Sequence, residues 1–293
     1  MANRVNRAIE LLQADQPVFY YGGHSGFDLS HENGVEQAAT KADYINIGME
    51  HGAFDMPGLD KFMAGLLAGG PTRSGHRTPT VIVEVPVIGE SEEVIRYNTW
   101  QFRQILGRGV HGILLCHAES PAAVKAFVEV CRFPRNLIGV GHGLDVGTRG
   151  VGGQAGPAEI WGVDSDEYVD RADPWPLNPD GELMLGLKIE NIRALNQVEA
   201  TLKIPGIAFA EWGPGDMAMS MGVDRSDSKG RHPRLKEARE RVFAACKENG
   251  VAFLDGFQKE TFAEQYAEGV RVSGYNEEVT EQVRALAGRT MPV

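Results

Sequence analysis

Leu183-Met184-Leu185-Gly186-Leu187-Lys188-Ile189-Glu190 is the stretch that decides the fold. It is an apolar run that ends on an acid, and a second such run leads into Glu211-Trp212-Gly213-Pro214-Gly215-Asp216. In both places an acid stands where a strand pattern stops and a turn or a helix begins, which is where an α/β barrel displays its catalytic groups. Two carboxylates delivered in this way, Glu190 and Asp216, suggest a site for a divalent metal.

Apolar, β-branched runs recur along the chain and alternate with segments of helical period. The runs that we interpret as strands are Val18–Tyr21, Tyr44–Gly48, Thr80–Val85, Gly112–Cys116, Leu183–Glu190, Ile207–Trp212, Val251–Leu254 and Val270–Gly274. The helical segments include Glu92–Leu106, Pro121–Cys131, Ile192–Ala200, Arg234–Asn249 and Thr261–Gly269. Strict β-then-α alternation implies a parallel sheet, and eight such units close into a (β/α)₈ barrel, a TIM barrel. We also expect an extra helix at Asn3–Ala14 that plugs or flanks the N-terminal face of the barrel, and a closing helix at Glu277–Ala287.

The 293-residue chain has the composition of an ordinary globular protein. Neither a Pro/Ser-rich linker nor a composition break marks a boundary, so we expect one domain over residues 1–293. No stretch approaches the roughly 18 uninterrupted apolar residues of a membrane span, and the N-terminus lacks the apolar region of a secretory signal. The three cysteines are scattered, and a net charge of -11 opposes binding to nucleic-acid phosphates. These features predict a cytoplasmic protein with no membrane partner and no nucleic-acid partner.

One long insertion, Gly139–Gly181, interrupts the regular alternation before the fifth strand. It is rich in Gly, Pro and Asp, with Trp161, Tyr168 and Trp175 embedded in it. Loops of this length in a compact domain are usually functional or disordered. We interpret it as an active-site lid or a subunit contact, and a mobile surface insertion is the alternative.

Residue parity along the fifth predicted strand places Lys188 beside Glu190. Side chains two residues apart point to the same face of a strand, so a cation lies next to the proposed metal ligand. Glu190 and Asp216 offer two hard oxygen ligands and leave coordination positions for water and a chelating substrate, as Mg²⁺ and Mn²⁺ sites do. The alternative for either acid is a cap on the helix or turn that follows it.

Two histidines are candidates for acid/base work at the barrel mouth. His51 follows the second strand, and the unperturbed pKa of histidine suits proton transfer near neutral pH. Glu50 beside it is a candidate acceptor for a hydrogen bond from metal-bound water. His24 follows the first strand and is a second acid/base candidate, with a plain turn residue as the alternative.

Short motifs at the ends of the predicted strands follow one another along nearly the whole chain. They are Glu50-His51, Arg73–Pro79, Leu114–Glu119 with Ser120-Pro121, Arg132-Phe133-Pro134, Arg149-Gly150-Val151-Gly152, Ile189-Glu190, Gly213-Pro214-Gly215-Asp216 with Met221-Gly222, and His232-Pro233. In this order and at these positions they resemble the HpcH/HpaI family of metal-dependent aldolases.

The resemblance implies a (β/α)₈ barrel that binds Mg²⁺, Mn²⁺ or Co²⁺ and forms a homo-oligomer, commonly a hexamer built as a trimer of dimers. By position, Glu190 and Asp216 match the metal ligands of the family and His51 matches its catalytic base. The turn Gly213-Pro214-Gly215, with His24 and Trp212, is then expected to contact substrate. In such enzymes the 2-oxo acid chelates the metal, which acts as a Lewis acid when the carbon–carbon bond breaks.

Four positions depart from the family pattern. Glu84 stands where the family carries the Arg that holds the oxo acid, Gly48 and Gly107 replace acids expected to support the histidine, and Lys188 replaces a Gln. A carboxylate does not bind another carboxylate at neutral pH unless one is protonated or a cation lies between them. We therefore expect Lys188 and Glu84 to pair across the mouth, and we expect a substrate other than a plain pyruvate adduct.

The leading hypothesis is a metal-dependent lyase of the aldol or retro-aldol type that acts on a small oxo- or hydroxy-acid. Trp161, Trp175 and Trp212 suit an aromatic substrate, since indole faces provide flat apolar contact, but loop aromatics also pack subunits together. One alternative makes Lys188 a Schiff-base nucleophile. The other is a non-catalytic paralogue that kept the barrel and lost the chemistry.

Overall fold

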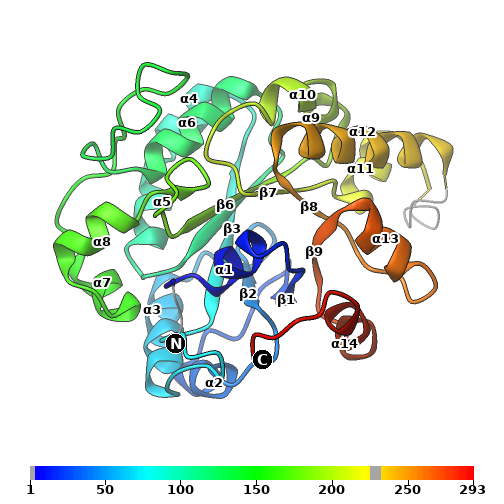
Figure 1. Ribbon diagram of the computed structural model, residues 1–293. Coiled ribbons are helices and arrows are strands. Elements are labelled where there is room, and N and C mark those ends of the chain that lie inside the picture. The colour runs from blue at the N-terminus through cyan, green and yellow to red at the C-terminus, as the bar shows by residue number, and fades with distance from the viewer. Residues whose placement is uncertain (1–3, 225–231) are drawn as a thin grey trace.

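The computed structural model describes residues 4–224 and 232–293, and within them eight parallel strands close into a ring (Figure 1). In ring order they are β1 (Val18–Gly23), β2 (Tyr44–Gly48), β3 (Thr80–Ile88), β4 (Gly112–Cys116), β6 (Leu183–Lys188), β7 (Phe209–Glu211), β8 (Ala252–Leu254) and β9 (Val270–Gly274). The β4–β6 and β1–β9 pairings close the ring. The predicted (β/α)₈ barrel is confirmed, with all eight strands at the expected places.

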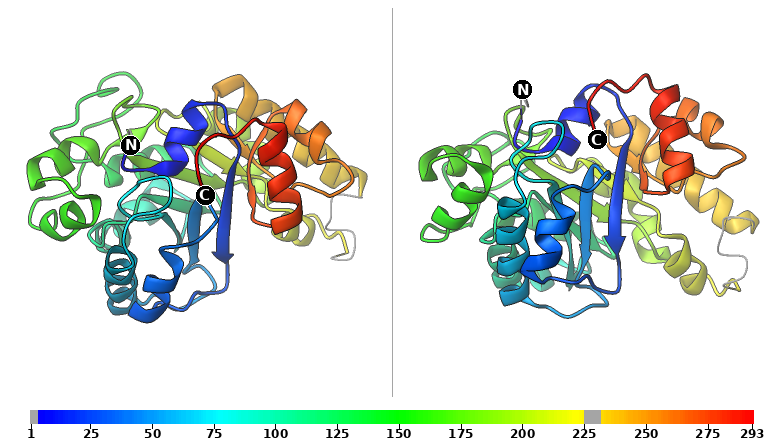
Figure 2. Two further views of the ribbon diagram at one scale, coloured as in Figure 1. Left: turned by 60° about the horizontal axis from the view of Figure 1, so that its bottom comes forward. Right: turned by 90° about the horizontal axis from the view of Figure 1, so that it is seen from below.

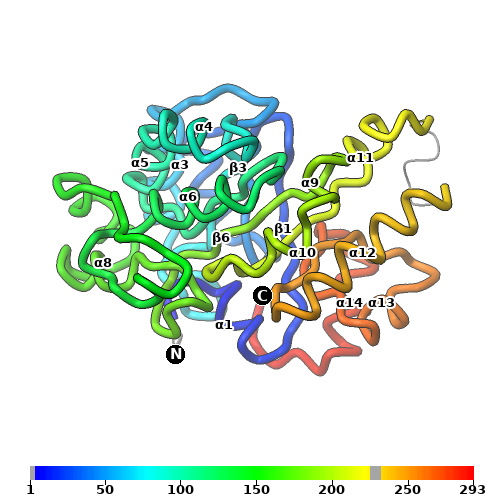
Figure 3. Tube along the Cα trace, turned by 90° about the horizontal axis from the view of Figure 1, so that it is seen from above, coloured from blue at the N-terminus to red at the C-terminus, as the bar shows by residue number. Residues whose placement is uncertain are grey.

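Helices surround this ring and close its N-terminal end (Figures 1 and 3). They are α1 (Arg7–Gln13), α2 (His31–Gln37), α3 (Met56–Ala68), α4 (Glu92–Tyr97), α5 (Thr99–Leu106), α6 (Pro121–Cys131), α7 (Ala155–Trp161), α8 (Ser165–Arg171), α9 (Ile192–Asn196), α10 (Val198–Thr201), α11 (Pro214–Ser220), α12 (Pro233–Asn249), α13 (Phe262–Glu268) and α14 (Glu277–Leu286). Two of the predicted helices are each divided in two. The break at Asn98 has a local cause, because its side-chain amide donates to the carbonyl of Val94 and ends α4.

The core has two layers. Most apolar side chains pack between the strands and the outer helices, while a smaller cluster fills the inside of the ring. Tyr44, Leu114 and Phe209 belong to the inner cluster, and Ile9 and Leu11 of α1 complete it. Because β2, β4 and β6 are buried at every residue, they read as continuous apolar runs in the sequence.

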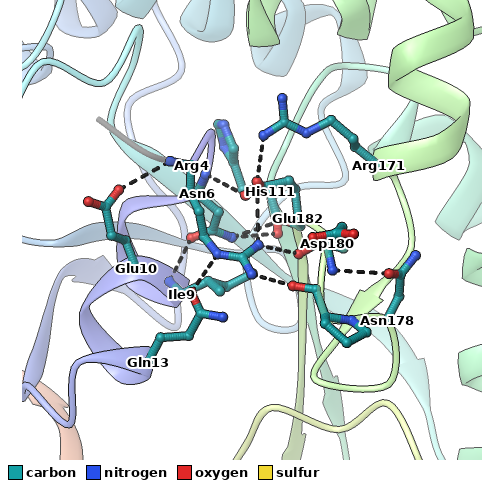
Figure 4. Close-up of polar contacts among 12 residues, drawn as sticks. Arg4, Asn6, Ile9, Glu10, Gln13, His111, Arg171, Asn178, Asp180 and Glu182 are labelled. Carbon is teal, nitrogen blue, oxygen red and sulfur yellow. Dashed lines mark hydrogen bonds and ion pairs between the residues drawn. The ribbon is translucent and has the colours of Figure 1, made fainter. Parts of the chain in front are cut away.

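The N-terminal helix closes the end of the barrel at which the strands begin. Asn6, which caps α1, donates to the carbonyls of His111 (3.2 Å) and Glu182 (3.1 Å) (Figure 4). It also accepts from Thr80 (3.1 Å), and these three partners stand at the starts of β4, β6 and β3. Figure 2 shows α1 at the end of the barrel from which the β1 arrow points away. The predicted extra helix therefore plugs the N-terminal face; Asn3, the first residue of the predicted range, lies outside the described residues.

The insertion before the fifth barrel strand forms α7, α8 and the short strand β5 (Pro174–Trp175), which pairs with the start of β6 outside the ring. The indole nitrogen of Trp161 donates to the Gly109 carbonyl (3.0 Å), and its ring stacks on His111 at 5.7 Å. The hydroxyl of Tyr168 donates to the Leu106 carbonyl (3.2 Å). All of these partners precede β4, so the helices are anchored near the N-terminal face. The interpretation as a lid is therefore wrong, and the subunit contact stays a prediction.

No helix within the described residues is long and apolar enough to cross a membrane.

Candidate active site

The charged residues that the sequence singles out meet at the end of the barrel where the strands finish. Lys188 and Glu211 are the last residues of β6 and β7, and Glu84 lies on β3 level with Gly48, the last residue of β2. Glu50 and Glu190 follow β2 and β6 by two residues. Because parallel strands all point the same way, side chains at their carboxyl ends converge on one mouth.

Lys188 is the centre of this group and is only 3% exposed. Its Nζ donates to Oε2 of Glu50 at 2.8 Å and lies 3.7 Å from Oε2 of Glu84 and 3.7 Å from Oε2 of Glu190. The predicted contact between Lys188 and Glu84 is present as an ion pair, but the hydrogen bond goes to Glu50. A single lysine thus faces three carboxylates.

Burial and neighbouring charges at the barrel mouth shift the pKa values of the ionisable side chains there. Burial alone would lower the pKa of Lys188, but the acids around it, Glu190 and Glu211 among them, raise that pKa above its ordinary value. Burial raises the pKa of Glu190, and Lys188 opposes the rise. Burial of Glu211 raises the pKa of its carboxyl to about 7. The lysine therefore stays protonated while carboxyl groups outnumber it.

Glu50, His117 and Glu190 bring three potential ligand atoms within 4.8 Å of one another. His117, directly after β4, has a φ of 45°, which a residue other than glycine rarely adopts. In this conformation its backbone N–H donates to Oε1 of Glu190 at 3.0 Å. Such strained residues gather at functional sites. His117 is not among the site residues that the sequence motifs single out, and its position immediately after a predicted strand is the signal that points to it.

Asn191 fixes the proton on the His117 ring. The Asn191 side-chain oxygen caps α9 by accepting from the N–H of Ala194 (2.9 Å), while its amide nitrogen donates to Oε1 of Glu119 (2.7 Å). The same amide nitrogen lies 3.0 Å from Nδ1 of His117, so Nδ1 accepts and the neutral ring carries its proton on Nε2. Nε2 faces Oε1 of Glu50 at 3.6 Å. His117 is therefore arranged to donate a hydrogen bond, and the two carboxylates remain as the candidate metal ligands.

The second predicted ligand, Asp216, lies in the first turn of α11 and is not part of this three-residue group. The turn before it does touch Glu190: Gly213 has a φ of 50°, and a Cβ there would come within 2.3 Å of the Glu190 Cβ. The assignment of Asp216 as a ligand stays a prediction. The oxygen donors of Glu50 and Glu190 fit a hard divalent cation such as Mg²⁺ or Mn²⁺.

His24 forms a tight pair with Glu84. Nδ1 of His24 lies 2.6 Å from Oε1 of Glu84, and Asn46 donates to the same oxygen at 2.7 Å. Gly48 makes this approach possible, because a Cβ at position 48 would come within 2.2 Å of the His24 carbonyl oxygen. The loss of the acid at position 48 thus makes room for the turn that carries His24. Glu84 raises the pKa of His24 through this hydrogen bond.

His51 and Trp212 also lie at the mouth. The side chain of His51 is 55% exposed, and its Nε2 lies 3.6 Å from Oε2 of Glu50. Trp212 is buried and donates its indole N–H to Asp255 at 3.1 Å.

Gly107 ends α5 ahead of β4, on the side of the N-terminal face, so an acid there would not reach His51 within one chain. Trp161 and Trp175 lie away from the mouth, and of the three tryptophans proposed for an aromatic substrate only Trp212 remains there.

Comparison with known proteins agrees with this geometry. The model of the HpcH/HpaI aldolase/citrate lyase family matches residues 79–285. A hydroxypyruvate/pyruvate aldolase of Agrobacterium fabrum is 26% identical over 249 residues, which cover 84% of this chain and 80% of the relative. A 2-keto-3-deoxy-L-rhamnonate aldolase of Klebsiella pneumoniae is 27% identical over 172 residues, which cover 56% of this chain and 57% of the relative.

Solved structures show the same fold. An HpcH/HpaI aldolase/citrate lyase family protein from Burkholderia cenocepacia has a TM-score of 0.67 at 24% identity, with 96% of each chain covered. Macrophomate synthase has a TM-score of 0.63 at 22% identity, with 97% of this chain and 87% of that chain covered. Fold and relatives together define an enzyme of the aldolase and lyase class. The chain belongs to the HpcH/HpaI aldolase/citrate lyase family, and the predicted resemblance is confirmed.

Proposed function

We propose that this enzyme makes or breaks a carbon–carbon bond of a small oxo acid by aldol chemistry and that it depends on a divalent metal. The observation that carries the proposal is the convergence of Glu50 and Glu190 beside His117 at the barrel mouth, with ligand atoms within 4.8 Å. Glu190 and Glu50 would hold the ion, with Asp216 from the neighbouring turn. A bound Mg²⁺, Mn²⁺ or Co²⁺ supplies a Lewis acid that polarises the oxo group of the substrate.

The His24–Glu84 pair supports a role for His24 in moving the proton. Because Glu84 accepts from Nδ1–H, the neutral ring keeps a lone pair on Nε2, and that atom is free to take the proton of a substrate hydroxyl. His51 is the second candidate, but it is more exposed and is held only by a 3.6 Å contact with Glu50. The geometry therefore favours His24.

Lys188 supplies the positive charge of the mouth. Its ammonium group lies among Glu50, Glu84 and Glu190, where it takes over part of the electrostatic work of the Arg that the family carries at position 84. The raised pKa of Lys188 argues against the Schiff-base alternative, because an imine forms only from the neutral amine.

The names of the relatives favour pyruvate or hydroxypyruvate as the oxo acid. The excess of acids at the mouth disfavours a second carboxylate elsewhere on the substrate. Trp212 is the one tryptophan of the three proposed that lies at the mouth, so it alone supports an aromatic substrate.

We further propose a homo-oligomer, a hexamer or trimer of dimers, which light scattering on the purified protein would test.

The metal dependence is tested by aldol addition of pyruvate or hydroxypyruvate to short aldehydes, with calorimetric titration of Mn²⁺ in parallel. We expect a chelator to remove activity and Mn²⁺ or Mg²⁺ to restore it. Glu190→Gln should weaken Mn²⁺ binding and lower kcat by about a hundredfold or more, whereas the exposed Glu93→Gln on α4 should change neither. Full activity in excess chelator would overturn the metal-dependent proposal.

A further inference from the structure

A cavity of about 250 Å³ opens at the mouth between the ends of β7, β8, β9 and β1. Its polar lining comes from Tyr20, Glu211, Asp255 and Ser273, and Trp212 forms part of its wall. Glu211 pairs in register with Lys188, so the cavity adjoins the charged group of the active site. Of its lining, Trp212 and Pro214 have been given a role above, as expected substrate contacts, and Glu211 has not.

One oxygen of Glu211 is left without a hydrogen-bond partner in this cavity. Its Oε2 is buried and has no hydrogen-bond partner among the described residues. Asp255, by contrast, is satisfied by Arg239 (2.6 Å), by the Trp212 indole (3.1 Å) and by the N–H of Gly256 (2.9 Å). An unpaired buried oxygen is costly, so its retention points to a ligand that supplies a donor.

Two further buried acceptor oxygens, on β2 and β3 outside the cavity lining, have no hydrogen-bond partner in the described chain. They are Oδ1 of Asn46 and Oε2 of Glu84, and the latter has only its 3.7 Å ion pair with Lys188. A carboxylate ligand would meet the like charges of Glu211 and Asp255 in the cavity, with the hydroxyls of Tyr20 and Ser273 as its side-chain donors. A hydroxyl group can both donate and accept, so it satisfies Glu211 in either protonation state, which matters because the pKa of Glu211 is about 7.

We propose, building on the proposed aldol function, that this cavity binds the hydroxylated end of the aldehyde partner. Glu211 accepts a hydrogen bond from a hydroxyl group of that aldehyde, and the Tyr20 hydroxyl lies at the same wall, beside Gly274. The oxo acid occupies the Glu50 and Glu190 side of the mouth, and the aldehyde chain extends past Lys188 toward Glu211. The site therefore selects polyhydroxylated aldehydes over deoxygenated or carboxylated ones.

The selectivity test compares D-glyceraldehyde with propanal, which has the same three carbons and neither hydroxyl. With pyruvate and Mn²⁺, the wild-type ratio of kcat/KM values should favour glyceraldehyde by about tenfold or more. Glu211→Leu should lower that ratio by about tenfold, and Tyr20→Phe should lower it less. Tyr21→Phe is the matched control on the outward-facing neighbour of Tyr20 and should leave the ratio unchanged.

A binding measurement separates this proposal from the proposed function. Saturation-transfer NMR with erythritol should show contact with the wild-type protein and none with Glu211→Leu, after thermal melting has shown that the variant is folded. If the wild type turns over neither aldehyde yet binds erythritol through Glu211, the aldol function fails and the cavity assignment stands. Equal erythritol contact in both proteins, or a glyceraldehyde preference that survives Glu211→Leu and Tyr20→Phe, would overturn the assignment.

Discussion

Nδ1 of His24 lies 2.6 Å from Oε1 of Glu84, so a histidine and a carboxylate form a pair at a place where the family resemblance leads one to expect an arginine. The pair orients the ring and leaves Nε2 as the reactive nitrogen. It joins β1 to β3 across the end of β2. Glu84 cannot replace the family's Arg as a cation, but paired with His24 it is a candidate for supporting proton transfer.

The pH dependence of activity should report this pair. Glu84 raises the pKa of His24, so the base form appears, and kcat/KM rises, through a pKa above the ordinary histidine value of about 6.5. Glu84→Gln removes the charge that favours the protonated ring, so the rise should move to lower pH, with a lower maximum. The measurement is kcat/KM from pH 5.5 to 9 for the two proteins. A limb that moves with His51→Gln and stays in place with Glu84→Gln would assign the base to His51 instead.

Lys188→Gln should strongly lower turnover while leaving the metal site intact. The change removes the cation that faces Glu50, Glu84 and Glu190, so Mn²⁺ affinity should be retained or increased, while kcat falls by about a hundredfold or more. Calorimetry and steady-state kinetics measure the two effects, with the exposed Lys259→Gln as the control. Borohydride with substrate should trap no adduct on Lys188; a stable adduct would restore the Schiff-base mechanism.

The tautomer of His117 is directly observable. NMR of protein labelled with ¹⁵N-histidine should show the neutral ring protonated on Nε2, because Nδ1 accepts from Asn191. Asn191→Asp keeps a side chain that caps α9 but replaces the donor with an acceptor, so the proton should move to Nδ1. His117→Ala assigns the signals. Protonation on Nδ1 in the wild type would leave Nε2 free and make His117 a metal ligand.

Asp43 should be a main determinant of stability. It is fully buried and lies 3.1 Å from Arg7, 3.4 Å from Arg284 and 3.0 Å from Arg289. Asp43→Asn leaves the buried guanidinium groups of Arg7 and Arg289 without their counter-ion, while Arg284 keeps its pair with Glu281 (2.8 Å). The change should lower the free energy of unfolding by about 3–5 kcal/mol. Urea titration measures the change. Glu277→Gln, in the exposed pair with Lys41, is the control and should have no measurable effect; an equally small effect of Asp43→Asn would contradict the prediction.

The barrel was predictable because buried parallel strands leave continuous apolar runs, and residue parity was enough to place Lys188 beside Glu190. Other features depend on information that no short pattern carries. His117 stands alone after its strand, and only the fold brings it to Glu50. Trp161 would look the same in the sequence whether it covered the mouth or packed at the opposite end. The direction in which the Asp216 side chain points is set by the backbone turn at Gly213, and a short sequence pattern does not specify that turn.

Gly48 has a consequence for how this site can change by mutation. Any side chain there would push the turn that carries His24 away from β2 and so separate His24 from Glu84. Positions 24, 48 and 84 therefore form one mutational unit, in which a substitution at one site is harmful unless the others change too. An acid restored at position 48 alone would clash with the turn that carries His24 and would disrupt the present site without rebuilding the family's usual one. A single substitution therefore cannot return this site to the family pattern.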